Sequence, residues 1–331
     1  MGISRARPGK QSGVSLVELM IGLALGLGIA LAATALLVQI LAAYRMQEAL
    51  ARVEDSGRHA LDIVSRELRR AGQRDFDQDS GAWVRWPAQL PALEGRDSAG
   101  LSAGGGLEAA NRQAHHGSDV LDIRFFGSKD GTVQNCAGFA VAAHPAKDSG
   151  AGADGVPGRS VFFVARSAGG EPELRCRYLG QSGWATDALV SGVESFQVAY
   201  GVDIDGDGMP DDFAAAGRMD KLPVGAHGSA WNRVVAVRFA LLVRSAEAVD
   251  AGAGDQSFDL FGSAYADQHA GSDPGTRLQR RELSEPNRLR RIFGATVRLR
   301  NWPDPLHPDP SQVPSGPAQA VSAAAAHGGQ P

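Results

Sequence analysis

The sequence predicts an α+β protein in which one long N-terminal helix packs against an antiparallel β-sheet head. An uncharged apolar run leads into an amphipathic stripe at helical spacing, and short β-branched runs follow without helical patterns between them. The 331 residues carry 33 basic and 37 acidic side chains. This balance provides no basic excess to attract phosphates, so nucleic acid is not expected as a partner.

The N-terminal apolar run is long enough to cross a membrane. Residues 19–38 carry no charge, and twenty residues in a helix span roughly 30 Å. Arg5, Arg7 and Lys10 precede the run, and such basic residues favour a cytoplasmic N-terminus. We therefore expect a single membrane-spanning helix, with the later residues outside the cytoplasm.

A glycine and a carboxylate lie at a fixed spacing just before this run, in Gly13-Val14-Ser-Leu-Val-Glu18. The pattern resembles the type III signal of type IV prepilins and pseudopilins, with Val14 where that family most often has phenylalanine. The resemblance implies that a prepilin peptidase cuts between Gly13 and Val14 and that the new N-terminus is methylated. It also implies that Glu18 pairs with the terminal ammonium of a neighbouring subunit, which offsets the desolvation of both groups. Alternatively, Glu18 is solvated among the lipid headgroups.

The helix is expected to continue beyond the membrane. Apolar residues recur every three or four positions between Met46 and Ala71, and Gly72 is a suitable C-terminal cap. One helix over residues 14–71 would be about 87 Å long. We predict a leader at 1–13, a membrane or filament-core helix at 14–44, an amphipathic continuation at 45–72, a β-rich head at 73–301 and a disordered tail at 302–331.

Six short β-type runs are predicted in the head, at residues 120–126, 160–166, 174–178, 193–202, 233–244 and 293–299. Because no helical pattern alternates with them, an antiparallel sheet is favoured over a doubly wound α/β fold. Three stretches rich in Ala, Gly and Asp, at 95–118, 143–159 and 246–276, are expected to be loops or insertions.

Three segments of the head resemble PilW-type minor pilins. They are Gly192-Val-Glu-Ser-Phe-Gln-Val-Ala-Tyr-Gly-Val-Asp203, the run 234–245 that ends in Leu241-Leu-Val-Arg-Ser245, and Arg290-Arg-Ile-Phe-Gly-Ala-Thr-Val-Arg-Leu-Arg-Asn301. The resemblance implies a pilin-like fold without enzymatic activity, held in the inner membrane with a periplasmic head. It further implies a protein that helps to initiate type IV pilus assembly from the tip. Its partners would be the prepilin peptidase, other minor pilins, the major pilin and a PilY-type tip adhesin.

Two other classes of protein remain open from the sequence. A minor pseudopilin of a type II secretion system would share the signal, the long helix and the β head. A singly anchored periplasmic enzyme or binding module would share only the anchor.

The two cysteines predict one disulfide. The topology places Cys136 and Cys176 in an oxidising compartment, beside neighbouring β runs, where a bridge would close a loop of about 40 residues. Two separately buried small side chains are the alternative.

The segment after the fourth β run is rich in aspartate and glycine. Asp203, Asp205, Asp207 and Asp211 stand at positions i, i+2, i+4 and i+8, as hard oxygen ligands do in the first half of an EF-hand calcium loop. Ala214 occupies the twelfth position, where a complete EF-hand has glutamate. We expect these four aspartates to bind one Ca²⁺; the alternative is a turn that binds no ion.

Overall fold

The computed structural model describes residues 13–77, 82–84, 86–87, 90–101, 106–111, 114–141, 143, 157–180, 183–223, 229–249, 255–269 and 271–301. The chain divides into two compact units, Met1–Ala51 and Arg52–Pro331. The predicted tail, and the predicted leader apart from Gly13, lie outside the described residues.

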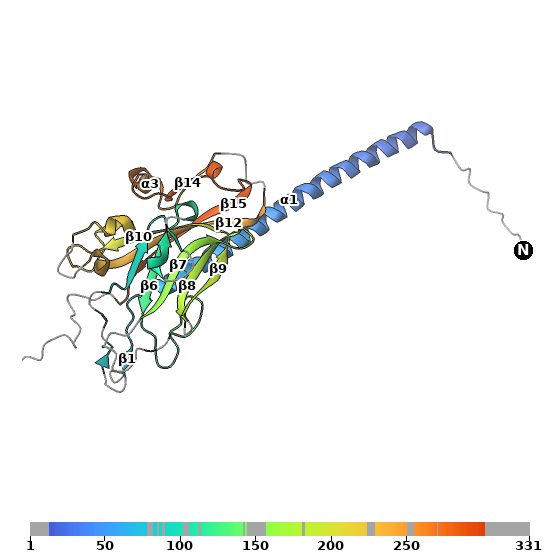
Figure 1. Cartoon of the computed structure of the whole chain (residues 1–331). Helices are drawn as coiled ribbons and strands as arrows, with labels where there is room; N and C mark the ends of the chain where they lie inside the picture. The colour runs from blue at the N-terminus through green and yellow to red at the C-terminus, as the bar shows by residue number, and fades with distance from the viewer. Residues whose placement is uncertain are drawn as a thin grey trace, which may run out of the picture. The chain divides into compact units, whose positions relative to one another are not determined.

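The first unit holds the apolar part of the long helix α1 (Leu16–Leu68), drawn in blue in Figure 1. Side chains from Leu16 to Tyr44 are exposed, and the only charge among them belongs to Glu18. By length and composition this helix can cross a membrane. Its lack of buried contacts is expected of a segment whose natural solvent is lipid or other helices.

The second unit uses the amphipathic end of α1 as part of its core. Val53, Ala60, Val64 and Leu68 are buried, and they pack in one cluster with residues from both large sheets. This is the face that the apolar spacing predicted. Gly72 has a φ of +70°, which suits glycine, and its N–H donates to the Arg124 carbonyl at 2.9 Å.

Two antiparallel sheets form the centre of this unit (Figure 1). A five-stranded sheet has the order β3-β6-β7-β8-β9 and a four-stranded sheet the order β11-β10-β12-β15. The strands are β3 (Leu93–Arg96), β6 (Val120–Phe125), β7 (Gly158–Arg166), β8 (Pro172–Gly180), β9 (Gly183–Ser191), β10 (Val193–Val202), β11 (Asp212–Ala214), β12 (Val234–Ala248) and β15 (Arg288–Arg298). The six predicted runs are confirmed as β6, β7, β8, β10, β12 and β15, and the α+β fold class is confirmed with them.

Smaller elements surround the two sheets. They are β1 (Phe76–Asp77), β2 (Ala82–Trp83), β4 (Gly100–Leu101), β5 (Ala110–Asn111), β13 (Ser257–Asp259), β14 (Arg277–Gln279), α2 (Ala216–Met219), α3 (Ser263–His269) and the 3₁₀ turns η1 (Leu107–Ala109), η2 (His115–Gly117), η3 (Ala230–Arg233) and η4 (Arg280–Glu282). The pairs β1–β2, β4–β5 and β13–β14 are antiparallel.

The outer face of β12 is covered by a stretch that was expected to be a loop. Alternate residues of β12, such as Phe239 and Leu241, face the main core, whereas Ala240 and Leu242 belong to a second cluster. Phe258, Leu260, Leu278 and Leu283 complete that cluster. Residues 246–276, which were predicted to be a loop or an insertion, hold the short elements β13 and α3.

The outer face of β7 is covered in a similar way. Val161 and Phe163 pack with Ala99 and Leu107, which lie in the predicted loop 95–118. That stretch holds β4, η1, β5 and η2. The third predicted loop, 143–159, lies mostly outside the described residues.

Candidate functional site

The predicted processing site lies just before α1. Gly13 and Val14 are exposed and precede the helix, and a side chain at Gly13 would meet no neighbour within 4 Å. Glu18 lies in the first helical turn, where a negative charge is favoured by the helix dipole. The backbone is therefore open to a peptidase, and cleavage after Gly13 stays a prediction.

Cys136 and Cys176 form a disulfide whose Cα atoms are 6.3 Å apart. It ties the loop after β6 to strand β8. The same loop is held to β7, because the Cys136 N–H donates to the Ser160 hydroxyl at 3.1 Å. Ser160 donates in turn to the carboxylate of Glu67 on α1 at 2.8 Å. One bridge and two hydrogen bonds thus connect the loop, the sheet and the helix.

Glu67 is an acid on the buried face of α1. Its side chain is fully buried, and burial raises its pKa, although the Ser160 hydrogen bond and the nearby Arg70 oppose the rise. Arg70 pairs with Glu67 at 3.1 Å and also donates to the Gln134 carbonyl. The spacing of apolar residues could not predict this buried acid, because Ser160, which donates to it, is 93 residues away in the sequence.

The aspartate-rich loop connects β10 to β11. Asp203 is buried, and its carboxylate accepts from the N–H groups of Gly206 at 2.6 Å and Gly208 at 2.8 Å. The Ile204 N–H donates to Asp211 at 2.7 Å. Ligand oxygens of Asp203, Asp205 and Asp211 lie within 4.8 Å of one another, a spacing that one cation can bridge.

Asp207 is not part of this group of three. Its carboxylate accepts from the Met209 N–H at 2.7 Å, and the side chain is exposed. The structure therefore brings three of the four predicted ligands together. An opposing charge is near, since Arg298 donates to the Gly208 carbonyl at 3.1 Å.

A second acidic site, at Asp119 and Asp273, was not predicted. Asp119 lies directly before β6 and accepts from the N–H groups of Ser98 at 3.0 Å and Val198 at 2.8 Å. Burial raises its pKa well above the ordinary value, and the nearby Asp97 and Asp273 add to the rise.

Asp273 follows α3 and belongs to the segment that covers β12. Tyr265 donates to one of its carboxylate oxygens at 2.9 Å, while the other is buried without a partner among the described residues. Burial raises the pKa of Asp273 to about 6. No single sequence motif joins positions 119 and 273, because only the folding of the chain brings them together.

The three segments that resemble PilW-type proteins meet in one ion cluster. Glu194 on β10 accepts from Arg290 on β15 at 2.6 and 2.9 Å, and both side chains are fully buried. Arg244 on β12 lies 3.5 Å from Glu194 and 2.7 Å from Glu171. These ion pairs replace the water that would otherwise stabilise each charge. The pairing therefore favours one alignment of β10, β12 and β15.

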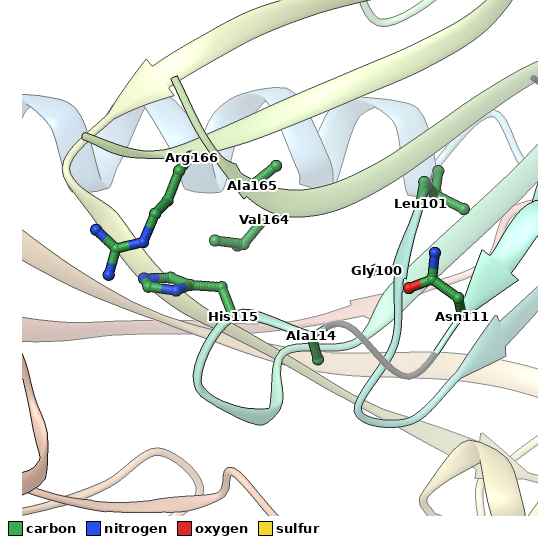
Figure 2. A pocket seen from close by; sticks show the side chains of 8 residues that line it. All are labelled: Gly100, Leu101, Asn111, Ala114, His115, Val164, Ala165 and Arg166. Carbon is green, nitrogen blue, oxygen red and sulfur yellow. The ribbon is translucent and has the colours of Figure 1, made fainter. Parts of the chain in front are cut away.

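A pocket of about 290 Å³ lies where β4, β5, η2 and β7 meet. Figure 2 shows Arg166 and His115 at one end and Leu101 and Asn111 at the other. His115 and His116 lie ring to ring, with centroids 4.1 Å apart, and the Nε2 atoms of both are buried without a partner in the described part of the chain. His116 has a φ of +49°, an uncommon conformation for a residue other than glycine.

Gly100, Ser102 and Gly104 have the G-x-S-x-G spacing of a hydrolase nucleophile elbow, and Gly100 lines this pocket. That motif needs a buried strand that leads into a helix. Here Gly100 and Leu101 form a two-residue strand of a hairpin, and the described chain resumes in the 3₁₀ turn η1. Ser102 lies outside the described residues, and the surrounding elements do not match the motif.

The chain matches no curated protein. A family model does match, over residues 161–301. The matched region begins in β7 and contains every later strand of the two large sheets, with all three segments of the ion cluster, but not β3 or β6. The apolar helix and the predicted processing site lie outside it. The description of the matching family is "Type IV Pilus-assembly protein W" (PilW). The match supports a place for this chain in that family and a role in type IV pilus assembly.

Proposed function

We propose that the chain is a minor pilin that helps to initiate type IV pilus assembly. The prepilin peptidase removes residues 1–13, and α1 holds the protein in the inner membrane with its head in the periplasm. The subunit then joins other minor pilins and the major pilin, at the tip of the filament, where the complex presents a PilY-type adhesin.

The match of residues 161–301 to the pilus-assembly family carries this proposal. The apolar helix supports it, since α1 has the length and composition to cross a bilayer, as a membrane-anchored subunit requires. Glu18 fits the same role, because a carboxylate at the start of an otherwise uncharged apolar segment is stabilised when it pairs with a neighbour's ammonium.

Deletion of the gene tests the proposal against the secretion alternative. We expect few or no surface pili by electron microscopy and normal type II secretion, with pili restored by the unaltered gene. Normal piliation with lost secretion would contradict the proposal.

Glu18→Ala tests the role of the helix in the same strain. The variant should insert in the membrane at normal levels but fail to restore pili, because only the pairing between subunits is removed. Glu48→Ala is the matched control, since it removes the same charge from the same helix beyond the uncharged run. Full piliation with Glu18→Ala would exclude the pairing.

A further inference from the structure

The outer face of β12 is covered by one segment, which we call the strap and define as residues 255–269 and 271–283. It holds β13, α3, β14 and η4, and among the described residues β13 and β14 pair only with each other. The strap lies on β12 through a small apolar cluster instead (Figure 1). The buried members of this cluster are Ala240 and Leu242 of β12 and Phe258, Leu260, Leu278 and Leu283 of the strap. A segment with so few buried apolar contacts can open while the sheets stay folded.

The turn after α3 is a second place where the strap touches the head. The Ser98 hydroxyl donates to the Pro274 carbonyl at 3.3 Å. Gly275 has a φ of +96°, and a Cβ added there would lie 2.6 Å from the Gly117 carbonyl oxygen and 2.5 Å from the Gln197 side-chain nitrogen. The backbone of this turn therefore packs directly on η2 and β10, at a distance that only glycine permits.

Asp273 begins this turn and places a carboxyl group inside the contact. Its side chain is buried, and one oxygen accepts from Tyr265 while the other has no hydrogen-bond partner among the described residues. The titratable groups that face it are Tyr265 and His269 from α3, Asp97 from the turn after β3, and Asp119 from the start of β6. In the part of the chain that the structure describes, no lysine or arginine forms an ion pair with Asp273. A negative charge here is therefore poorly compensated.

The surroundings of Asp273 favour its neutral form. Burial raises its pKa to about 6, with a further rise from Asp97, whereas the Tyr265 hydrogen bond and His269 oppose the rise. Burial, Asp97 and Asp273 likewise raise the pKa of Asp119 well above its ordinary value. A carboxyl whose pKa is raised on docking favours the docked strap most below pH 3.8 and loses this contribution as the pH rises through 6.

We propose that the strap is a pH-sensitive cover, which docks on β10 and β12 under acidic conditions and opens more often at neutral pH. An ionised Asp273 is hydrated when the strap is open, but in the docked turn it is buried with one oxygen unpaired. Opening exposes the outer face of β12 at Ala240 and Leu242. The main core stays intact, because it lies on the other face of the sheet.

Hydrogen–deuterium exchange of the full chain in detergent tests the proposal at pH 5.0 and 7.5, with labelling times adjusted for the intrinsic dependence of exchange on pH. An isolated pair of strands is marginally stable in water, so an open strap also loses its internal hydrogen bonds. A docked pKa of about 6 and an ordinary 3.8 in the open strap predict about tenfold more opening at pH 7.5.

Peptides from β10 and β12 are the internal reference and should exchange equally slowly at both pH values. No increase in the strap at pH 7.5 would overturn the proposal. An equal increase in the strap and in β10 and β12 would also overturn it, because the whole head would then be unfolding.

Variants show whether Asp273 is the group that controls the strap. Asp273→Asn should remove the tenfold difference, because the amide stays neutral at both pH values. Asp267→Asn is the matched control, since Asp267 is an exposed acid of the same strap that pairs with Arg277, and its loss should leave the difference unchanged. A tenfold difference that persists in Asp273→Asn would overturn the proposal.

Tyr265→Phe tests the same group without removing its charge. In the unaltered protein, opening should stop increasing with pH near 6. In Tyr265→Phe it should stop at a higher pH, because the Tyr265 hydrogen bond lowers the pKa of Asp273. A plateau at the same pH in both proteins would overturn the role of Asp273.

Discussion

At the scale of single residues, some buried acids of the head have a cationic partner and others do not. Glu194 and Arg290 are paired and hydrogen-bonded, so each stabilises the other. Among the described residues Asp119 and Asp273 form no such pair with a cation, and burial raises the pKa of both. The sequence shows only that acids occur at these positions. Whether a given acid is paired depends on segments far apart in the sequence, 96 residues for Glu194 and Arg290.

Asp273→Asn should stabilise the head at neutral pH. A carboxyl whose folded pKa is about 6, against an ordinary 3.8, stabilises the fold below 3.8 and loses that contribution as the pH rises through 6. The neutral amide avoids the cost of a buried charge at pH 7.5, up to about 3 kcal/mol or a rise in Tm of roughly 10 °C. At pH 4 the difference from the unaltered protein should be small.

Thermal unfolding of the full chain in detergent at several pH values measures this effect. His115 acts in the opposite direction, because its folded pKa of about 4 lies below the ordinary 6.5 and its contribution is lost as the pH falls. The Tm of Asp273→Asn is therefore compared with that of the unaltered protein at each pH, so that the effect of His115, which both share, cancels. A difference in Tm that does not change with pH would contradict the assignment to Asp273.

At the scale of elements, long apolar strands could be predicted and short or exposed ones could not. β12 and β10 are buried along nearly their whole length, so their sequences are continuous β-type runs. β9 is an edge strand with mostly exposed or half-buried residues, and its sequence lacks the apolar alternation that marks a strand. The covering elements β13 and α3 were missed because each buries only a few residues against a sheet.

The disulfide should contribute strongly to the stability of the β8 region. Its loop of 40 residues gives about 4 kcal/mol in the chain-entropy model. Cys136→Ser together with Cys176→Ser should lower the free energy of unfolding by up to this amount, as measured by urea denaturation. Alkylation of the non-reduced protein is the independent test, and two reactive thiols would contradict the bridge.

The loop between β10 and β11 should bind calcium through three of its aspartates. We propose that Asp203, Asp205 and Asp211 supply the carboxylates, since their oxygens lie within 4.8 Å of one another. Calcium should raise the Tm of the full chain more than magnesium does, because the smaller Mg²⁺ requires a stricter octahedral shell.

Asp205→Asn should abolish the calcium-dependent shift in Tm. Asp207→Asn is the matched control, because Asp207 lies outside the group of three and its loss should leave most of the shift. An equal loss in both variants would assign the ion to all four aspartates. No shift in the unaltered protein, with or without chelator, would show that the aspartates serve the turn alone.

At the scale of the whole molecule, the chain combines an apolar helix without buried contacts and a β-rich unit with its own core. Both parts could be predicted, because a long uncharged run and a set of β-type runs are visible without knowledge of contacts. The pocket and the ion cluster could not, because each gathers residues from several elements. The family match covers residues 161–301, within the predicted head, so the predicted signal at Gly13 would be an independent link to a pilus.

The N-terminus of the mature protein tests the central claim most directly, since a prepilin-type subunit must lose its leader and keep its helix. Intact-mass and N-terminal analysis of the membrane-extracted protein should give a chain that begins at Val14, and a strain without prepilin peptidase should retain residues 1–13. A mature chain that begins near residue 36, after cleavage within the apolar run, would contradict the account.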